Sequence, residues 1–372
     1  MSGQADEIRQ AVRRYAAEQL APHAARWDRD KEFPREALKG LAEMGLYGVA
    51  VPEEWGGAGM DYTSLAVACE EIAAGDCATA TIVAVNNLVA GILNGYGNQN
   101  QKEKYLRPLA QGRMLGAFAL TEPQVGSDAS AITTRAERKG NEYVLNGVKQ
   151  FITSGKNADI AVVFAVTDKG AGKKGISAFL VPTSTPGYKV ARIEDKLGQR
   201  ASDTAQIVLE GCKTDLLLGQ EGAGYRIALA NLESGRINVA AQATGVARAA
   251  LDAAIAYTRE RKSMGKTLIE HQAVNFRLAD MATQVEAARQ LYLHAARLRD
   301  AGQPCLKEAS MAKLFASEMA EKVCSDAIQV HGGYGYVSDF PVERLWRDVR
   351  VTKIYEGAND IQRMVIGREL EG

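Results

Sequence analysis

The spacing of apolar residues changes twice along this chain, and those changes limit the folds that it can form. As far as about Gln111, apolar residues such as Ile8 and Val12 recur at three- and four-residue intervals, which is typical of amphipathic helices. From 116 to about 218 the chain instead carries short β-rich runs separated by Gly, Asn, Asp and Lys. After Gly224 helical periodicity returns in long, alanine-rich stretches. The predicted order is therefore helices, strands and helices.

A chain of 372 residues is longer than one typical hydrophobic core requires, so it should divide into two or three domains. We predict an α+β protein with an N-terminal α-helical domain over 1–115, a middle β-barrel-like domain over 116–224 and a C-terminal four-helix bundle domain over 225–372. The stretch 170–175 is predicted to be a hairpin loop. The predicted strands and long C-terminal helices lie at 143–145, 160–166, 176–181, 205–209, 239–259, 272–298 and 305–328.

The charges balance, because the chain has 45 Lys and Arg residues and 45 Asp and Glu residues. A net formal charge of zero supplies no overall field for binding nucleic acid or an anionic membrane. Asn and Gly residues interrupt the uncharged stretch 78–101, so we predict a buried helix followed by a loop and no membrane span. The polar N-terminus has mixed charge and lacks the features of a targeting segment, and we expect a cytoplasmic protein.

Cysteine and histidine spacing gives no sign of a disulfide framework or a metal site. The five cysteines show no C-x-x-C spacing, and the four histidines form no H-x-x-x-H pair. We therefore expect neither disulfides nor a protein-bound metal ion.

One carboxylate, Glu356, stands at a glycine-broken entry to a predicted C-terminal helix, in the segment Lys353-Ile-Tyr-Glu-Gly-Ala-Asn-Asp-Ile-Gln-Arg363. An acidic residue near a helix N-terminus is usually a capping or dipole-stabilising group, worth well under about 2 kcal/mol. A carboxylate in such a place can also take a proton from carbon. The segment alone does not decide between these two roles.

Four further motifs precede that carboxylate along the chain. They are Phe118-Ala-Leu-Thr-Glu-Pro-Gln-Val-Gly-Ser-Asp128, Phe151-Ile-Thr-Ser-Gly155, Arg261-Lys-Ser-Met-Gly265 and Gln329-Val-His-Gly-Gly333. The first, second and fourth also have plain structural interpretations as a turn, a β-strand and a helix C-cap. In this order, and over essentially the whole chain, the motifs resemble the acyl-CoA dehydrogenase family, flavoenzymes that oxidise acyl-CoA thioesters to 2-enoyl-CoAs.

The resemblance implies that the cofactor is FAD. In the family, the loop equivalent to the one with Pro123 and Gly126 lies along the isoalloxazine ring, where its donors support negative charge at N1 and O2. The segment that begins at Phe151 covers the flavin, and Thr153 is placed to hydrogen-bond near N5. The residues implied to contact the flavin are Phe118, Leu120, Thr121, Gly126, Ser127, Phe151, Ile152, Thr153, Ala358, Asn359 and Asp360.

A second group of residues is implied to clasp the adenine-diphosphate half of FAD, partly across a subunit interface. An arginine there supplies charge-assisted bonds to the pyrophosphate, and glycines permit close approach of the backbone. The residues are Arg261, Met264, Gln272, Gln329, His331, Gly332 and Gly333. Because the family is typically a tetramer built as a dimer of dimers, we expect a homotetramer.

The resemblance also assigns the catalytic base, which removes the α-proton of the acyl-CoA while the β-hydrogen leaves as hydride to flavin N5. Isovaleryl and long-chain members place this Glu directly before the Arg of an acidic-x-x-Arg segment, which is Glu233-Ser-Gly-Arg236 here. Gly235 cannot act at that site, so Glu356 is the remaining candidate. We expect this segment to precede the first long C-terminal helix and to lie beside the CoA, although a surface ion pair is the simpler alternative. The substrate-binding residues implied are Ser127, Glu233, Arg236 and Gly357.

An exposed Glu is a feeble base toward carbon, because its pKa is about 4.3. We expect desolvation by the acyl chain to raise the pKa of Glu356 toward neutrality. The resemblance implies that the backbone N–H of Glu356 and a ribityl hydroxyl of FAD stabilise the charge at the thioester oxygen. It also implies that the electrons pass to an electron-transferring flavoprotein.

Three positions depart from common family patterns. Phe151 stands where many members carry Trp, Met264 where Phe is usual, and Ala358 where Thr is common. We expect stacking at Phe151 without an indole donor, and a weaker stacking contact at Met264. Short/branched-chain members also carry Ala at position 358, and we predict a short or short-branched acyl-CoA as substrate.

Three other functional interpretations of the sequence remain open. A relative of the oxidase or desulfinase type shares the scaffold but has a different outcome. A DNA-associated flavoprotein of the alkylation-response branch also shares it, but would need a basic patch or extra domain, which zero net charge disfavours. A non-catalytic scaffold would fit a degraded base or flavin loop, and here both are intact.

Overall fold

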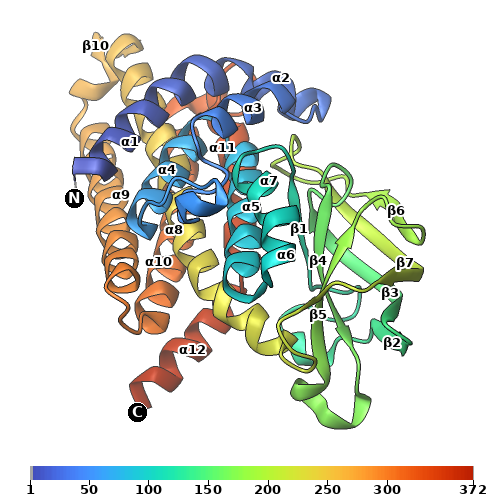
Figure 1. Cartoon of the computed structure of the whole chain (residues 1–372). Helices are drawn as coiled ribbons and strands as arrows, with labels where there is room; N and C mark the ends of the chain where they lie inside the picture. Colours follow the sequence, from blue (N-terminus) through green and yellow to red (C-terminus); the bar gives the residue numbers. More distant parts are fainter. Residues whose placement is uncertain (1–2, 372) are drawn as a thin grey trace.

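The computed structural model describes residues 3–371. Helices from both ends of the chain pack together, and the sheet formed by the middle of the chain lies on one side of them (Figure 1). Asp61 and Asp76 begin α4 and α5, since their carboxylates accept bonds from the backbone N–H groups of Ser64 and Thr79 at 2.7 and 2.8 Å. The N-terminal helices are α1 (Gly3–Tyr15), α2 (Ala21–Asp30), α3 (Arg35–Glu43), α4 (Tyr62–Gly75), α5 (Cys77–Tyr96), α6 (Gln99–Gln101) and α7 (Arg107–Ala110). The predicted order of helices, strands and helices is confirmed.

The middle segment forms one eight-stranded sheet in the order β6-β7-β3-β2-β4-β5-β8, with β1 parallel to β4. The strands are β1 (Gly116–Ala119), β2 (Arg135–Lys139), β3 (Glu142–Thr153), β4 (Ile160–Val166), β5 (Ile176–Pro182), β6 (Tyr188–Ile193), β7 (Thr204–Thr214) and β8 (Leu217–Leu218). The predicted hairpin loop joins antiparallel β4 and β5 and contains the 3₁₀ segment η5 (Lys169–Gly175). β4 and β5 are buried along nearly their whole length, as their continuous apolar runs indicate.

Three long helices dominate the C-terminal part, with α8 packed against α9, α10 and the N-terminal α4. The C-terminal elements are α8 (Gly224–Glu260), β9 (Lys262–Ser263), β10 (Lys266–Thr267), α9 (Gln272–Asp300), α10 (Leu306–His331), α11 (Val342–Val349) and α12 (Asn359–Glu371). With 37 residues, α8 is about 55 Å long. It begins beside β5 and ends near β10, on the far side of the bundle from the sheet (Figure 1).

The expected start of the first long C-terminal helix was wrong. The segment 233–236 does not precede this helix but lies inside α8, which begins at Gly224. Gly235 lies inside this helix, where a glycine costs up to about 1 kcal/mol relative to alanine. Tertiary packing outweighs that cost here.

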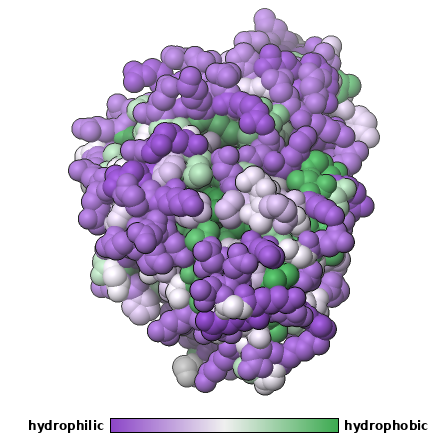
Figure 2. All heavy atoms as spheres, turned by 45° about the vertical axis from the view of Figure 1, so that its right-hand side comes forward, coloured by the Kyte–Doolittle hydropathy of each residue, from purple (hydrophilic) through white to green (hydrophobic). Residues whose placement is uncertain are grey.

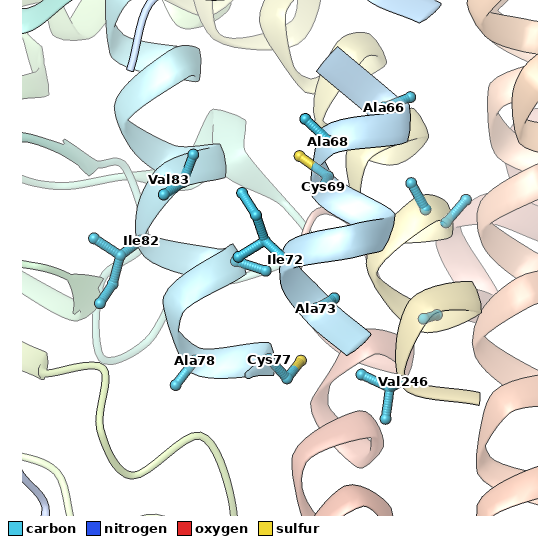
Figure 3. Close-up of a cluster of buried hydrophobic side chains, with 14 of the residues drawn as sticks. Ala66, Ala68, Cys69, Ile72, Ala73, Cys77, Ala78, Ile82, Val83 and Val246 are labelled. Atoms are coloured by element: carbon cyan, nitrogen blue, oxygen red, sulfur yellow. The ribbon is translucent and has the colours of Figure 1, made fainter. Parts of the chain in front are cut away.

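α5 has the length and apolar composition of a membrane span, but 78% of its most apolar 18-residue window is buried inside the folded chain. Figure 3 shows Ile72 of α4 and Val83 of α5 in the core between these helices, with Val246 of α8 nearby. α5 is therefore a core helix, as predicted. Hydrophilic residues cover most of the face in Figure 2, with smaller hydrophobic areas between them.

Candidate active site

Glu356 lies in the loop between η8 (Arg350–Lys353) and α12, where the backbone takes two successive left-handed conformations. The φ angles are +53° for Glu356 and +88° for Gly357. A residue other than glycine adopts such a conformation only when its surroundings fix it. Here the carbonyl of Gly357 accepts hydrogen bonds from Lys313 Nζ and Gln362 Nε2, both at 2.8 Å. The glycine-broken entry to the last helix is therefore confirmed, and buried donors hold it.

The carboxylate of Glu356 packs against the bare backbone of Gly235 on α8. A methyl group at position 235 would come within 2.3 Å of Glu356 Oε2. This oxygen is buried and has no hydrogen-bond partner within residues 3–371, which is unusual for a carboxylate. Burial raises the pKa of Glu356 to about 7, although Arg236 and Lys313 oppose this shift. A base with this pKa is matched to proton abstraction near neutral pH.

The backbone N–H of Glu356 is also available. It donates to no acceptor in the described part of the chain. Glu356 thus presents an unused N–H donor and a basic oxygen from the same residue. This pair suits a carbonyl compound that loses a proton from the adjacent carbon, because the N–H can stabilise charge on the carbonyl oxygen.

Glu233 and Arg236 do not form the simple surface ion pair with each other. Glu233 instead pairs with Arg299 of α9 at 3.1 Å. Arg236 is 7% exposed, its Nη1 donates to Ser310 Oγ at 3.4 Å, and its Nε is buried without a partner in the described chain. Burial lowers the pKa of Arg236, and the nearby Glu356 charge opposes this. The structure therefore brings Arg236 near Glu356, while Glu233 pairs α8 with α9.

A buried ion pair shapes the loop that follows β1. Lys149 Nζ donates to the carbonyl of Leu120 at 3.0 Å and to Glu122 Oε1 at 2.9 Å. Glu122 also accepts bonds from the backbone N–H groups of Thr133 and Thr134. Burial lowers the pKa of Lys149 to about 8, whereas for Glu122 the Lys149 charge and these bonds outweigh burial and lower the pKa to about 2. Both groups are therefore charged near neutral pH and fix the loop from inside.

The outer side of this loop carries donors that the protein does not use. The carbonyl of Thr121 accepts from the backbone N–H of Gln150 at 2.8 Å, which holds the loop against β3. Within residues 3–371, the backbone N–H groups of Gly126 and Ser127 and the hydroxyls of Thr121 and Thr153 donate to no acceptor. Such a set of free donors beside a strand end can bind the carbonyl and ring-nitrogen acceptors of a planar cofactor.

Phe151 adds an exposed aromatic ring to these free donors. It has a φ of +59° and is 62% exposed, so an aromatic ring is held out of the core by strained backbone. Its neighbour Ile152 is buried and anchors β3 in the sheet. An exposed ring beside free donors fits the isoalloxazine of FAD, which needs both stacking and hydrogen bonds.

A hollow of about 550 Å³ lies at the C-terminal ends of α8 and α10. His331 is buried there and stacks on Tyr257, its Nδ1 lies 2.8 Å from the carbonyl of Ala327, and burial lowers its pKa. Gly332 is the C-cap of α10, with a φ of +62°, which confirms the cap interpretation. The hollow is lined by Tyr257, Arg261, Ser263, Leu268, Val330, His331, Gly332, Gly333, Tyr334 and Val337.

This hollow also fits part of FAD. A side-chain Cβ at Gly332 or Gly333 would meet nothing within 4 Å, so the backbone there is open to a ligand. Arg261 is exposed and lies over the ring of Tyr334, where its guanidinium can bind a phosphate. Met264 and Gln329, in the two motifs that border the hollow, are exposed, and so is Gln272 at the start of α9. An adenine-diphosphate group matches this mixture of aromatic, glycine and cationic groups.

The structure thus places Glu356 far from the hollow at Arg261 within one chain. Gly235, which lies beside the Glu356 carboxylate, and Arg261, the C-cap of α8, are 26 positions apart, or about 39 Å along the helix. Asn359 is turned inward and bonded to Lys313 and Ser317, whereas Asp360 is exposed. Of the remaining predicted residues, Phe118 lies in β1, Leu120 directly follows β1, and Ala358 lies between Gly357 and α12.

Sequence reasoning missed the buried groups that support the two loops. These are Lys313 and Gln362 behind Glu356, and Lys149 with Glu122 behind the loop after β1. Lys313 does leave a local signal, because its neighbours at i−4, i+3 and i+4 are small residues on a helix face that is buried. A lone lysine on such a face points to a specific partner across the core.

Comparison with known proteins matches all three parts of the chain. The models described as "Acyl-CoA dehydrogenase, N-terminal domain", "middle domain" and "C-terminal domain" match residues 2–113, 117–212 and 222–371. An acyl-CoA dehydrogenase from Bacillus subtilis (strain 168) is 47% identical over 98% of this chain and 97% of its own length. The mitochondrial short-chain specific acyl-CoA dehydrogenase of Rattus norvegicus is 46% identical over 98% of this chain and 89% of its own length.

Solved structures agree with these matches. The butyryl-CoA dehydrogenase of Megasphaera elsdenii superimposes with a TM-score of 0.98 and 40% identity, covering 100% of this chain and 99% of that one. A glutaryl-CoA dehydrogenase from Mycobacterium smegmatis, in complex with FADH2, gives a TM-score of 0.94 and 32% identity, covering 100% and 95% of the two chains. With its three segments and its fold all in agreement, the chain belongs to the acyl-CoA dehydrogenase family of oxidoreductases.

Proposed function

We propose that this protein is an FAD-dependent dehydrogenase of short or short-branched acyl-CoA thioesters, which passes electrons to an electron-transferring flavoprotein. The observation that carries the proposal is the Glu356 loop, where an unpartnered buried carboxylate oxygen and an unused backbone N–H come from one residue. The proposal that an electron-transferring flavoprotein accepts the electrons rests on the family relationship. The FADH2 bound to the Mycobacterium smegmatis relative supports FAD as the cofactor.

Glu356 takes the α-proton of the acyl-CoA in this proposal, and its backbone N–H stabilises the charge that develops on the thioester oxygen. Bound FAD supplies the oxidant, because its ring accepts the β-hydrogen together with its electron pair. Phe151 and the donors of Thr121, Gly126, Ser127 and Thr153 hold that ring. Arg236 lies beside the base and favours its ionised form.

The cofactor is proposed to lie across two subunits, with the hollow at Arg261 on one chain completing the flavin site of another. A distance of about 39 Å along α8 separates the hollow from the base in one chain, which is longer than an extended dinucleotide. Two apolar side chains near the hollow are almost fully exposed, Met264 by 92% and Tyr336 by 88%, and their burial against another protein would be favourable. α12 projects from the bundle (Figure 1) and would also pack on another copy. We propose a homotetramer on this basis.

A short acyl chain is favoured by polar groups that lie past the base. Gln242 follows Gly235 by seven residues on the same face of α8, about 10 Å further along. Its Oε1 accepts a bond from the hydroxyl of Tyr355 at 2.9 Å, and Gln199 and Thr81 extend this buried polar cluster. A long alkyl chain in this direction would strand these groups without partners, which costs about 1–3 kcal/mol each.

The test is a substrate panel assayed with the FAD-loaded protein and an electron-transferring flavoprotein. Butyryl-, isobutyryl-, 2-methylbutyryl- and octanoyl-CoA are compared, and the 2-enoyl-CoA product is identified by mass. We expect turnover of at least one short substrate and much slower turnover of octanoyl-CoA. Preference for octanoyl-CoA would contradict the predicted chain length, and the absence of any enoyl product would contradict the dehydrogenase proposal. Turnover with oxygen alone would instead favour an oxidase.

A further inference from the structure

We propose that Lys313 is a positioning residue for the base, an inference that rests on the proposed role of Glu356. Lys313 lies on α10 and is 0% exposed. Its Nζ donates to the carbonyl of Gly357 at 2.8 Å and to Asn359 Oδ1 at 2.9 Å. Lys313 therefore contacts the residue after the base and the first residue of α12, and not Glu356 itself.

A buried ammonium with these partners is costly. No carboxylate of the described chain lies within 4.0 Å of Lys313 Nζ, so two neutral oxygens are its partners. Burial lowers the pKa of Lys313 to about 7, which the Glu356 charge opposes. Packing alone would be served better by an apolar side chain of similar volume. The cost is explained if the bonds of Lys313 fix something that the reaction needs.

The fixed element is the left-handed turn at Glu356 and Gly357. Gln362 Nε2 donates to the same Gly357 carbonyl at 2.8 Å, and Ser317 holds Asn359 at 3.0 Å. α10 and α12 thus clamp the turn from two sides. Because both φ angles are positive, loss of the clamp lets the turn relax, and relaxation redirects the Glu356 carboxylate and N–H together.

Lys313 also adds a charge near the base. The charged groups that face Glu356 are Arg236 from α8 and Lys313 from α10, and each favours the ionised carboxylate. Loss of Lys313 should therefore raise the pKa of Glu356 further above its ordinary value. A side chain that only filled space would not move this pKa.

The experiment compares Lys313→Met, Lys313→Gln and the control Lys322→Met in the FAD-loaded protein. Lys322 lies on the same helix but is exposed and pairs with Asp326, outside the site. Crystal structures report the Glu356–Gly357 turn, and anaerobic flavin reduction by butyryl-CoA is followed against pH.

For Lys313→Met we expect a displaced turn, about hundredfold slower reduction and a pH profile moved upward, because a displacement of about 1 Å can cost that factor. Lys313→Gln keeps a donor but no charge, so it should hold the turn better and still move the profile. The control should match wild type in all respects.

An unchanged turn together with a wild-type rate and pH profile in Lys313→Met overturns the proposal. If this variant does not fold, Lys313→Gln decides by the same two readouts, and a wild-type pH profile there overturns the proposal. If no acyl-CoA reduces the wild-type flavin, the proposed function fails, and the crystal structures alone then decide whether Lys313 holds the turn.

Discussion

Gly235→Ala adds one methyl group to α8 directly beside the carboxylate of Glu356. The new Cβ would lie 2.3 Å from Glu356 Oε2, whereas such contacts are ordinary only beyond 3.4 Å and essentially never occur below 3.0 Å. The carboxylate must therefore move by roughly 0.7–1 Å. A misplacement of about 1 Å in a catalytic group can slow a reaction about a hundredfold, or about 2.7 kcal/mol in the activation barrier.

The assay is anaerobic reduction of the bound flavin by butyryl-CoA in a stopped-flow instrument, at saturating substrate. Gly367→Ala is the matched control, because Gly367 lies inside α12 and a Cβ there would meet nothing within 4 Å. Both variants gain helix propensity, worth up to about 1 kcal/mol, so lost activity in Gly235→Ala would not reflect a weakened helix. A wild-type rate for Gly235→Ala, with a fully loaded cofactor, would refute the placement of the base.

Three further predictions follow from the buried charges. The rate of flavin reduction should rise with pH through about 7, since burial raises the pKa of Glu356 and only the ionised form is a base; a flat profile across this range would contradict it. The pKa of Glu356 in the folded protein is raised above its ordinary value of 4.5, so wild type loses stability as pH rises from 4.5 to about 7. Glu356→Gln should therefore raise the free energy of unfolding at pH values above about 7 and should not raise it below pH 4.5. Lys149→Met should cost about 3–5 kcal/mol in urea unfolding, because it leaves Glu122 charged and buried, and adding Glu122→Gln should recover part of this loss.

Local sequence patterns predicted the order of elements, because helix and strand periodicity does not depend on distant contacts. They failed at the start of α8, which was predicted to lie after Gly235. The actual role of Gly235 is to leave room for a carboxylate 121 positions later in the chain, which no local pattern reports. The loop at Glu356 was found through its motif and its glycine, both of which are local features.

The supporting groups could not be found in the same way. Lys313 meets Gly357 across 44 positions, and Lys149 meets Glu122 across 27. In the sequence, each lysine looks like an ordinary exposed charged residue, because its hydrogen-bond partner is distant in the chain. Glu356 and the hollow at Arg261 also lie about 39 Å apart along α8, and this separation depends on the helix continuing unbroken through Gly235.

A single-turnover comparison of wild type with Glu356→Gln tests most directly whether Glu356 is the base. Both proteins are loaded with FAD and mixed anaerobically with butyryl-CoA while the flavin absorbance is recorded. We expect wild type to be bleached, and we expect the variant to bind FAD equally well without being bleached. Bleaching of both at similar rates would contradict the assignment of Glu356 as the base.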